Sequence, residues 1–340
     1  MNGQERTYRA IKLEKPDRVP MDNNLLLSAY LSYKEKIHDI IKIYPNDVST
    51  ILSSQEKHDL DITYHDGYVK DSWGVTWYNP NGYGYKGIPQ GHPIDEWSKL
   101  GSYRVPFKEI KDSFRNMSEN IKNTRSKFIK GGWIRLFERM HFLRGFENLL
   151  LDLGYQDDRV IKLRDMVMEY NLSLLKEYLK YDIDLVCFSD DWGTQTSLMI
   201  SPGSWRNIFK PCYDEMVSIV HDHGKLTCLH SDGMISSIMD DIVEIGFDVV
   251  NLQIHLFDFN QLRDNYAEKV CFWGRLDFQK LHRISPEEAS NEVKFLISNL
   301  GKAQGGYIGE VGCGDEVSLT TIEAIFKAYS NHGIIHQDIE

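Results

Sequence analysis

Apolar runs alternate with amphipathic segments along this chain, and the alternation predicts its fold. The segments between the runs repeat apolar residues every three or four positions, as helices that cover a sheet do. Two of these helices have clear starting signals, Ser201-Pro202 and Ser285 with Glu288 three positions later. The runs have the length and composition of buried strands. They lie at 185–188, 225–229, 248–252, 270–274 and 306–309.

The N-terminal part adds further elements to this pattern. A strand is expected from about Arg18 to Asn23, a helical stretch over 28–60, and another strand over 128–136. Residues 61–103 are dense in Gly, Pro, Trp and Tyr, which predicts short strands and turns in an elaborated loop or lid. No linker rich in Gly, Ser or charge divides the chain. The sequence therefore predicts an α/β fold, a single (β/α)8 TIM barrel over residues 1–340 with an elaborated N-terminal region.

Polar residues recur where the predicted strands end. Parallel strands of a barrel end on one rim, and that rim carries the chemistry of such folds. Residues that face a rim need no charge for stability, so a repeated set of polar groups there predicts an active site. The set consists of Asn23, Glu138, Asp190, Asp191, His230, Asp232, Gln253, Asp277, Glu310 and Cys313.

His230 and Asp232 form the most specific pair in this set. They are two positions apart, so both side chains point the same way if the strand geometry persists. Cys313, three residues after Glu310 at the end of the last strand, could supply a third ligand. One imidazole, one carboxylate and one thiolate make a catalytic zinc site. In the alternative interpretation His230 only bonds a neighbour at the rim, and Cys313 is a loop thiol.

Asp190 and Asp191 are candidates for acid–base work or for substrate binding. The alternative for Asp190 is a cap on the segment that follows it. Asp191 is followed by Trp192-Gly193-Thr194-Gln195, a stretch typical of the loops that build an active site. No phosphate-binding glycine motif is present, which disfavours nucleotide binding.

Charge and cysteine content narrow the class of protein. The net charge of -11 argues against nucleic acid or an anionic membrane as the main partner. The five cysteines are scattered and odd in number, as in reduced intracellular proteins. The chain shows no signal peptide and no apolar run near the roughly 20 residues of a membrane span. We expect a cytoplasmic protein.

Several motifs together resemble the uroporphyrinogen decarboxylase superfamily, over nearly the whole chain. They are Pro16-Asp17-Arg18-Val19-Pro20, Phe142-Leu143-Arg144-Gly145, Asp190-Asp191-Trp192-Gly193, His230-Ser231-Asp232-Gly233 and Phe272-Trp273-Gly274-Arg275. The resemblance implies a barrel whose activities include porphyrinogen decarboxylation and zinc-dependent methyl transfer to or from corrinoid proteins.

Two departures from the family pattern favour the methyltransferase branch. The decarboxylases carry an arginine-rich motif after the first strand, whereas Asp22-Asn23-Asn24-Leu25 has no arginine to bind a polyacidic tetrapyrrole. The methyltransferases use His-x-Cys and a late Cys as zinc ligands. His230 and Cys313 match, and Asp232 replaces the middle Cys. This harder ligand set suits the polarisation of a methyl ether oxygen.

The resemblance thus implies a methyltransferase that demethylates a small methoxy-type compound and passes the methyl group to a corrinoid on a partner protein. The expected partners are a small-molecule methyl donor, the corrinoid protein and a second copy of the chain. Two alternatives remain: a metal-free decarboxylase or lyase acting on another carboxylate, and a barrel without catalytic activity. The expected residues are Asp190, Asp191 and Glu138 for catalysis, Asn23, Gln195, Gln253 and Asp277 for substrate, and His230, Asp232, Cys313 and Glu310 for zinc.

Overall fold

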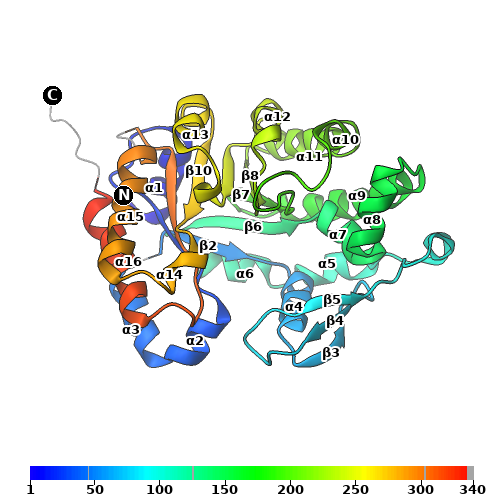
Figure 1. Ribbon diagram of the computed structural model, residues 1–340, viewed down its shortest axis with the longest axis horizontal. Helices are drawn as coiled ribbons and strands as arrows, with labels where there is room; N and C mark the ends of the chain where they lie inside the picture. The colour runs from blue at the N-terminus through cyan, green and yellow to red at the C-terminus, as the bar shows by residue number, and fades with distance from the viewer. Residues whose placement is uncertain (45, 125, 302–303, 335–340) are drawn as a thin grey trace. The chain divides into compact units, whose positions relative to one another are not determined.

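The computed structural model describes residues 1–44, 46–124, 126–301 and 304–334. Within these residues, eight strands form one parallel, barrel-like sheet with the order β1-β11-β10-β9-β8-β7-β6-β2 (Figure 1). The strands are β1 Met21–Asn23, β2 Val48–Ile51, β6 Phe128–Ile134, β7 Leu185–Ser189, β8 Leu226–Ser231, β9 Val249–Leu252, β10 Cys271–Arg275 and β11 Tyr307–Val311. The predicted α/β barrel is confirmed.

Helices lie between the successive strands of the barrel-like sheet, and α1 and α16 lie before its first strand and after its last. They are α1 Gly3–Lys12, α2 Leu27–Tyr33, α3 Glu35–Ile43, α4 Ser54–Thr63, α5 Ile110–Ser113, α6 Met117–Lys122, α7 Phe137–Arg144, α8 Phe146–Gly154, α9 Arg159–Tyr178, α10 Pro202–Ile208, α11 Lys210–Asp222, α12 Met239–Ile245, α13 Phe259–Tyr266, α14 Phe278–Leu281, α15 Pro286–Leu300 and α16 Leu319–His332. Both predicted starting signals are confirmed, because Ser201 caps α10 and Ser285 forms a capping box with Glu288. None of the described helices is long and apolar enough to cross a membrane.

The chain divides into two compact units. Unit 1 comprises Met1–Ser49, Thr124–Lys130 and Phe247–Glu340, and unit 2 comprises Thr50–Asn123 and Gly131–Gly246. Unit 1 therefore holds β1 and β9 to β11, and unit 2 holds β7 and β8. Strands β2 and β6 begin in unit 1 and end in unit 2.

In unit 1, the Pro-Asp-Arg-Val-Pro motif belongs to a cluster of ion pairs around the buried Asp47. Asp47 accepts hydrogen bonds from Arg6 and Arg18 at 2.7 Å each, and from the backbone N–H of Met21 at 2.9 Å. Arg6 also binds Asp17. Partial burial alone would raise the pKa of Asp17, but the hydrogen bonds from Arg6 outweigh it and lower that pKa to about 2. The cluster fixes the entry to β1 against the start of β2.

In unit 2, residues 61–103 form a small antiparallel sheet beside α4 (Figure 1). Its strands are β3 Gly67–Lys70, β4 Thr76–Asn79 and β5 Ile88–Gly91. The short strands and turns predicted for this segment are present. A role as a lid stays a prediction.

Two sequence predictions of secondary structure were wrong in part. The stretch 28–60 was expected to be helical throughout, but it contains β2, whose polar Ser49 and Thr50 do not read as a buried strand. These four residues form a strand because of the register and hydrogen bonds of the barrel, and not because of their own hydrophobic pattern. The helix expected after Ser201 is broken at Phe209, because Pro211 at the start of α11 has no N–H to continue the preceding helix.

Candidate functional site

Strands β7 and β8 of unit 2 bring the candidate site residues together. They are parallel and in register, with Ser189 opposite His230. The pairing continues past the end of β7, because the backbone N–H of Asp190 donates to the carbonyl oxygen of His230 at 3.1 Å. Residues that follow β7 therefore lie beside the last residues of β8.

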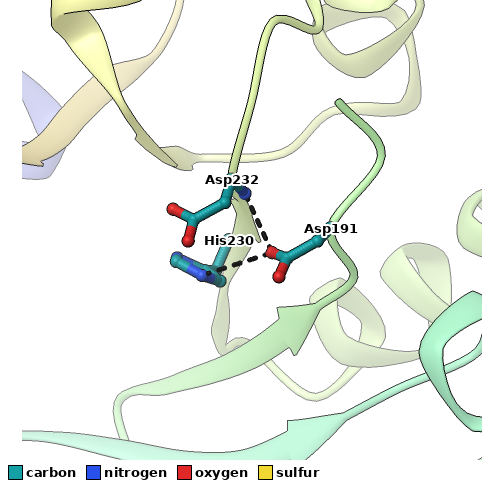
Figure 2. A group of neighbouring side chains, drawn as sticks. All are labelled: Asp191, His230 and Asp232. Carbon is teal, nitrogen blue, oxygen red and sulfur yellow. Dashed lines mark hydrogen bonds and ion pairs between the residues drawn. The ribbon is translucent and has the colours of Figure 1, made fainter. Parts of the chain in front are cut away.

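Asp191, His230 and Asp232 form a compact cluster at this point (Figure 2). Each offers one ligand atom, and these atoms all lie within 4.8 Å of one another. Asp191 Oδ1 lies 3.6 Å from His230 Nε2 and accepts a 2.9 Å hydrogen bond from the backbone N–H of Asp232. The side chains of His230 and Asp191 are 25% and 38% exposed, so solutes can reach the cluster.

The donor set and its spacing fit a zinc ion. In a tetrahedral zinc site with bonds of about 2.1 Å, two ligand atoms lie about 3.4 Å apart. The separation of 3.6 Å between Asp191 Oδ1 and His230 Nε2 is close to that value and longer than a hydrogen bond. Imidazole and carboxylate are both accepted zinc ligands. Asp191, His230 and Asp232 could therefore hold a metal ion.

Asp190 lies next to this cluster in sequence but is fully buried. Its carboxylate accepts hydrogen bonds from the backbone N–H groups of Leu136 and Glu138 at 2.9 and 2.7 Å, and from the hydroxyl of Tyr213 at 2.5 Å. Burial, together with the charge of Glu138, raises the pKa of Asp190 to about 7. The residue thus fixes the start of α7 against the end of β7; the helix it caps precedes it in the chain and is not the following segment that the sequence suggested.

Glu138 lies in the first turn of α7, four residues after β6 ends. Its carboxylate is buried and forms an ion pair with Arg135 at 3.0 Å. Burial raises the pKa of Glu138; Arg135 acts in the opposite direction, and the charge of Asp191 adds to the rise. Glu138 is therefore an acidic group near the candidate metal cluster.

The loops that carry Asp191 and Asp232 cross in close backbone contact. Gly193 N–H donates to the carbonyl oxygen of Asp232 at 3.2 Å. A Cβ at Gly233, whose φ is +84°, would lie 2.1 Å from the carbonyl oxygen of Gly193. Only glycine allows this approach. The crossing fixes two of the three cluster residues relative to each other.

Trp192 explains another part of the Asp-Asp-Trp-Gly motif. It is fully buried, stacks on Phe137 with ring centroids 4.2 Å apart, and donates from Nε1 to Tyr213 at 3.2 Å. Asp190, Tyr213 and Trp192 thus form one buried network beneath the loop. The motif alternates residues that anchor the loop with Asp191, which is left partly exposed.

The other predicted site residues have defined local surroundings. Gln195 is exposed in the loop after β7 of unit 2. In unit 1, Asn23 ends β1, Gln253 is buried after β9, and Asp277 caps α14 and lies 3.5 Å from His255. No observation in the structure tests whether these four residues bind substrate, so that role stays a prediction.

Glu310 and Cys313, the remaining predicted zinc ligands, are buried residues of unit 1. Glu310 accepts hydrogen bonds from Asn24 and Asn251 at 2.9 Å each and lies 3.5 Å from Arg275. Burial raises the pKa of the Cys313 thiol to about 12. Their role as zinc ligands also stays a prediction. Asp191, which the sequence suggested for catalysis, is the third member of the cluster in unit 2.

Two residues near the cluster were not found from the sequence. His141 on α7 has a pKa lowered by burial to about 3, so its imidazole is neutral, and it interacts electrostatically with Asp191. Lys86 lies between β4 and β5 and interacts electrostatically with Asp191 and Asp232. The sequence marks Lys86 only as the one Lys or Arg between positions 71 and 98, which does not indicate that it lies near Asp191.

Comparisons with known proteins bear on this arrangement. A family model described as "Uroporphyrinogen decarboxylase (URO-D)" matches residues 131–332, more than half of the chain. No curated protein sequence matches the chain. The solved structure of a methyltransferase from Methanosarcina mazei is similar, with a TM-score of 0.67 and 14% identity over 97% of this chain and 98% of that one. At this identity the similarity shows a shared fold.

A chitinase from Chromobacterium violaceum ATCC 12472 is much less similar. Its TM-score is 0.41 and its identity 8%, over 94% of this chain and 100% of that one. A TM-score this low carries no argument about the present chain.

Proposed function

Since this chain belongs to the uroporphyrinogen decarboxylase (URO-D) family, we propose that it is a zinc-dependent methyltransferase. In this proposal it demethylates a small methoxy-type compound and passes the methyl group to a corrinoid on a partner protein. The observation that carries the proposal is the cluster of Asp191, His230 and Asp232, whose atoms are spaced to hold a metal ion. The shared fold with a methyltransferase is consistent with it.

The ligand set supports a methyl ether over a thiol as the group that is activated. Two carboxylates and one imidazole are harder ligands than thiolates, and they favour a metal that acts on oxygen. A zinc ion held by Asp191, His230 and Asp232 would supply Lewis acidity toward the ether oxygen. The two loops keep Asp191 and Asp232 in place through the Gly193–Gly233 crossing.

The reaction also needs a proton. In the proposed transfer the methyl C–O bond would break, the methyl group would go to the reduced cobalt(I) of the corrinoid, which would supply the electron pair of the new bond, and the oxygen would take up a proton. We propose Glu138 as the source of that proton, because burial raises the pKa of its carboxyl against the opposing effect of Arg135, and because Glu138 and Asp191 interact electrostatically. Asp190 acts as a positioning residue through its three hydrogen bonds.

The assignment of Cys313 and Glu310 to zinc stays a prediction outside the three-ligand set proposed here. Asn23, Gln253 and Asp277 of unit 1, and Gln195 of unit 2, are proposed as substrate contacts. The basis for these assignments is the family pattern and the ends of the strands that carry them, not a measured contact with the cluster.

A methyl-transfer assay tests the proposal. The zinc-loaded protein is incubated with free cob(I)alamin and, separately, with methoxyacetate, 4-methoxybenzoate and 4-methoxybenzamide, and formation of methylcobalamin is followed by absorbance. We expect methylcobalamin and the demethylated product from at least one of the three, and loss of both after zinc is removed by a chelator. Release of CO2 without methylcobalamin, undiminished by the chelator, would contradict the proposal and support the metal-free decarboxylase.

A further inference from the structure

Unit 2 contains a narrow recess, and one of its lining residues, Lys86, interacts electrostatically with Asp191 and Asp232 of the candidate cluster. The volume of the recess is about 50 Å³, and α4, β4, β6, α7 and α9 contribute to its walls. Three cationic and three of the aromatic residues that line it matter here: Lys86, Arg135, Arg139, Trp73, Trp77 and Trp133. A single water needs roughly 10–15 Å³ of such space. The recess therefore accepts a small polar head group, and the rest of a larger ligand lies outside it.

The acidic residues that line the recess are already satisfied by the protein. They are Glu56, Asp59 and Asp71, and each accepts hydrogen bonds from two or more donors of unit 2. Glu56 accepts from Ser53, Trp133 and Tyr178. Asp59 accepts from Gln55 and Ser72. Asp71 accepts from Trp73, Val75 and Trp77. These carboxylates have structural partners and are not needed to bind a ligand.

The cationic residues, by contrast, keep donors for a ligand. Arg135 pairs with Glu138 at 3.0 Å, and Arg139 pairs with Asp71 at 3.4 Å. A guanidinium has five N–H donors, and one carboxylate does not use them all. Arg139 is also held over the ring of Trp73, at 4.5 Å from the ring centroid. Both arginines are thus fixed in place with N–H groups to spare.

Lys86 is the residue that links the recess to the metal cluster. In the part of the chain that the structure describes, it forms no hydrogen bond and no ion pair. It is nevertheless close enough to Glu138, Asp191 and Asp232 to interact with their charges. An ammonium group beside satisfied carboxylates and two arginines, without a partner of its own, is complementary to an anion.

We propose that this recess binds the carboxylate of an anionic substrate through Lys86, Arg135 and Arg139, so that the chain acts on a methoxy carboxylic acid. The inference rests on the proposed function for the methoxy part of the substrate. The carboxylate part rests on the recess alone. The tryptophans line the same recess and provide apolar contact for the atoms that follow the carboxylate.

Binding of a charged probe and of its neutral counterpart tests this inference. The probes are 4-methoxybenzoate and 4-methoxybenzamide, which have the same number of heavy atoms and differ in charge. Calorimetric titration into the zinc-loaded protein, without corrinoid or reductant, gives Kd for each probe. We expect the acid to bind at least about tenfold more tightly than the amide, because hydrogen bonds to a charged group are the stronger ones.

Three variants locate the effect. Lys86→Ala is expected to weaken binding of the acid at least about tenfold and to leave the amide unchanged. Lys86→Arg is expected to retain most of the affinity. Lys99→Ala is the control, since Lys99 belongs to the same segment but does not line the recess and pairs with Asp95 at 2.5 Å. It is expected to bind the acid as the unmodified protein does.

Equal affinity for acid and amide, or an unchanged Kd in Lys86→Ala, would overturn the inference. The same holds if Lys99→Ala weakens binding as much as Lys86→Ala. Binding is measured without methyl transfer, so failure of the proposed function leaves this result intact. If the acid binds through Lys86 but no methylcobalamin forms in the assay above, the recess assignment stands and the methyltransferase proposal fails.

Discussion

Replacing His230 by alanine is expected to lower the affinity for zinc at least about a hundredfold. His230 supplies the only imidazole of the cluster formed with Asp191 and Asp232, and even the loss of a group that supports a zinc ligand costs 10–100-fold, roughly. Competition between the protein and a chromophoric chelator measures this affinity directly. Methyl transfer is expected to fall in parallel.

His223→Ala is the control for this experiment. His223 is exposed at the end of α11, and its Nδ1 lies 2.8 Å from the carbonyl oxygen of Ile219. The variant is expected to bind zinc as the unmodified protein does. Unchanged zinc affinity in His230→Ala would show that the cluster does not hold the metal.

Replacing Gly233 by alanine is expected to remove more than about 4 kcal/mol from the free energy of unfolding and to leave little soluble protein. The new Cβ would lie 2.1, 2.2 and 2.5 Å from the backbone atoms O, C and Cα of Gly193. Backbone atoms at a crossing cannot rotate away as a side chain does. The positive φ of +84° adds strain of its own.

Soluble yield and thermal unfolding measure this effect. Gly154→Ala at the end of α8 is the matched control, because a Cβ there meets nothing within 4 Å. That change is expected to be neutral or to stabilise by up to about 1 kcal/mol. A Gly233→Ala protein that unfolds at the temperature of the unmodified one would show that the two loops do not need their close contact.

In the proposed reaction, Asp232 is the residue that favours action on an oxygen over action on a thiol. The family's methyltransferases have a cysteine at the equivalent place in the His-x-Cys motif, and a thiolate would make the site softer. Because position 232 is an aspartate, the two ligands at the end of β8 are an imidazole, from His230, and a carboxylate, from Asp232. This is the residue-level reason for proposing an oxygen-bound methyl group as the one that is removed.

Much of the fold could be predicted because each local signal agrees with the barrel. The apolar runs that become β7 to β11, and the caps at Ser201 and Ser285, depend on nearby residues only. Strand β2 could not be predicted in this way. Its four residues contain two polar side chains, and their strand geometry depends on partners that are distant in the sequence.

The candidate site divides in a similar way. The spacing of His230 and Asp232 was visible because both residues belong to one strand end. The position of Asp191 beside this pair was not visible, because it depends on the register of β7 against β8, which places Ser189 opposite His230. Lys86 comes from the small sheet of residues 67–91 and approaches the cluster only through tertiary structure. No pattern within one segment predicts that approach.

Anomalous X-ray scattering at the zinc edge tests most directly whether Asp191, His230 and Asp232 bind zinc. Crystals grown with equimolar zinc are measured just above and just below that edge. We predict one strong anomalous peak bonded to His230 Nε2 and to carboxylate oxygens of Asp191 and Asp232, at about 2.0–2.2 Å. A fully occupied zinc elsewhere with none at these three residues, or no peak at all, would contradict the account.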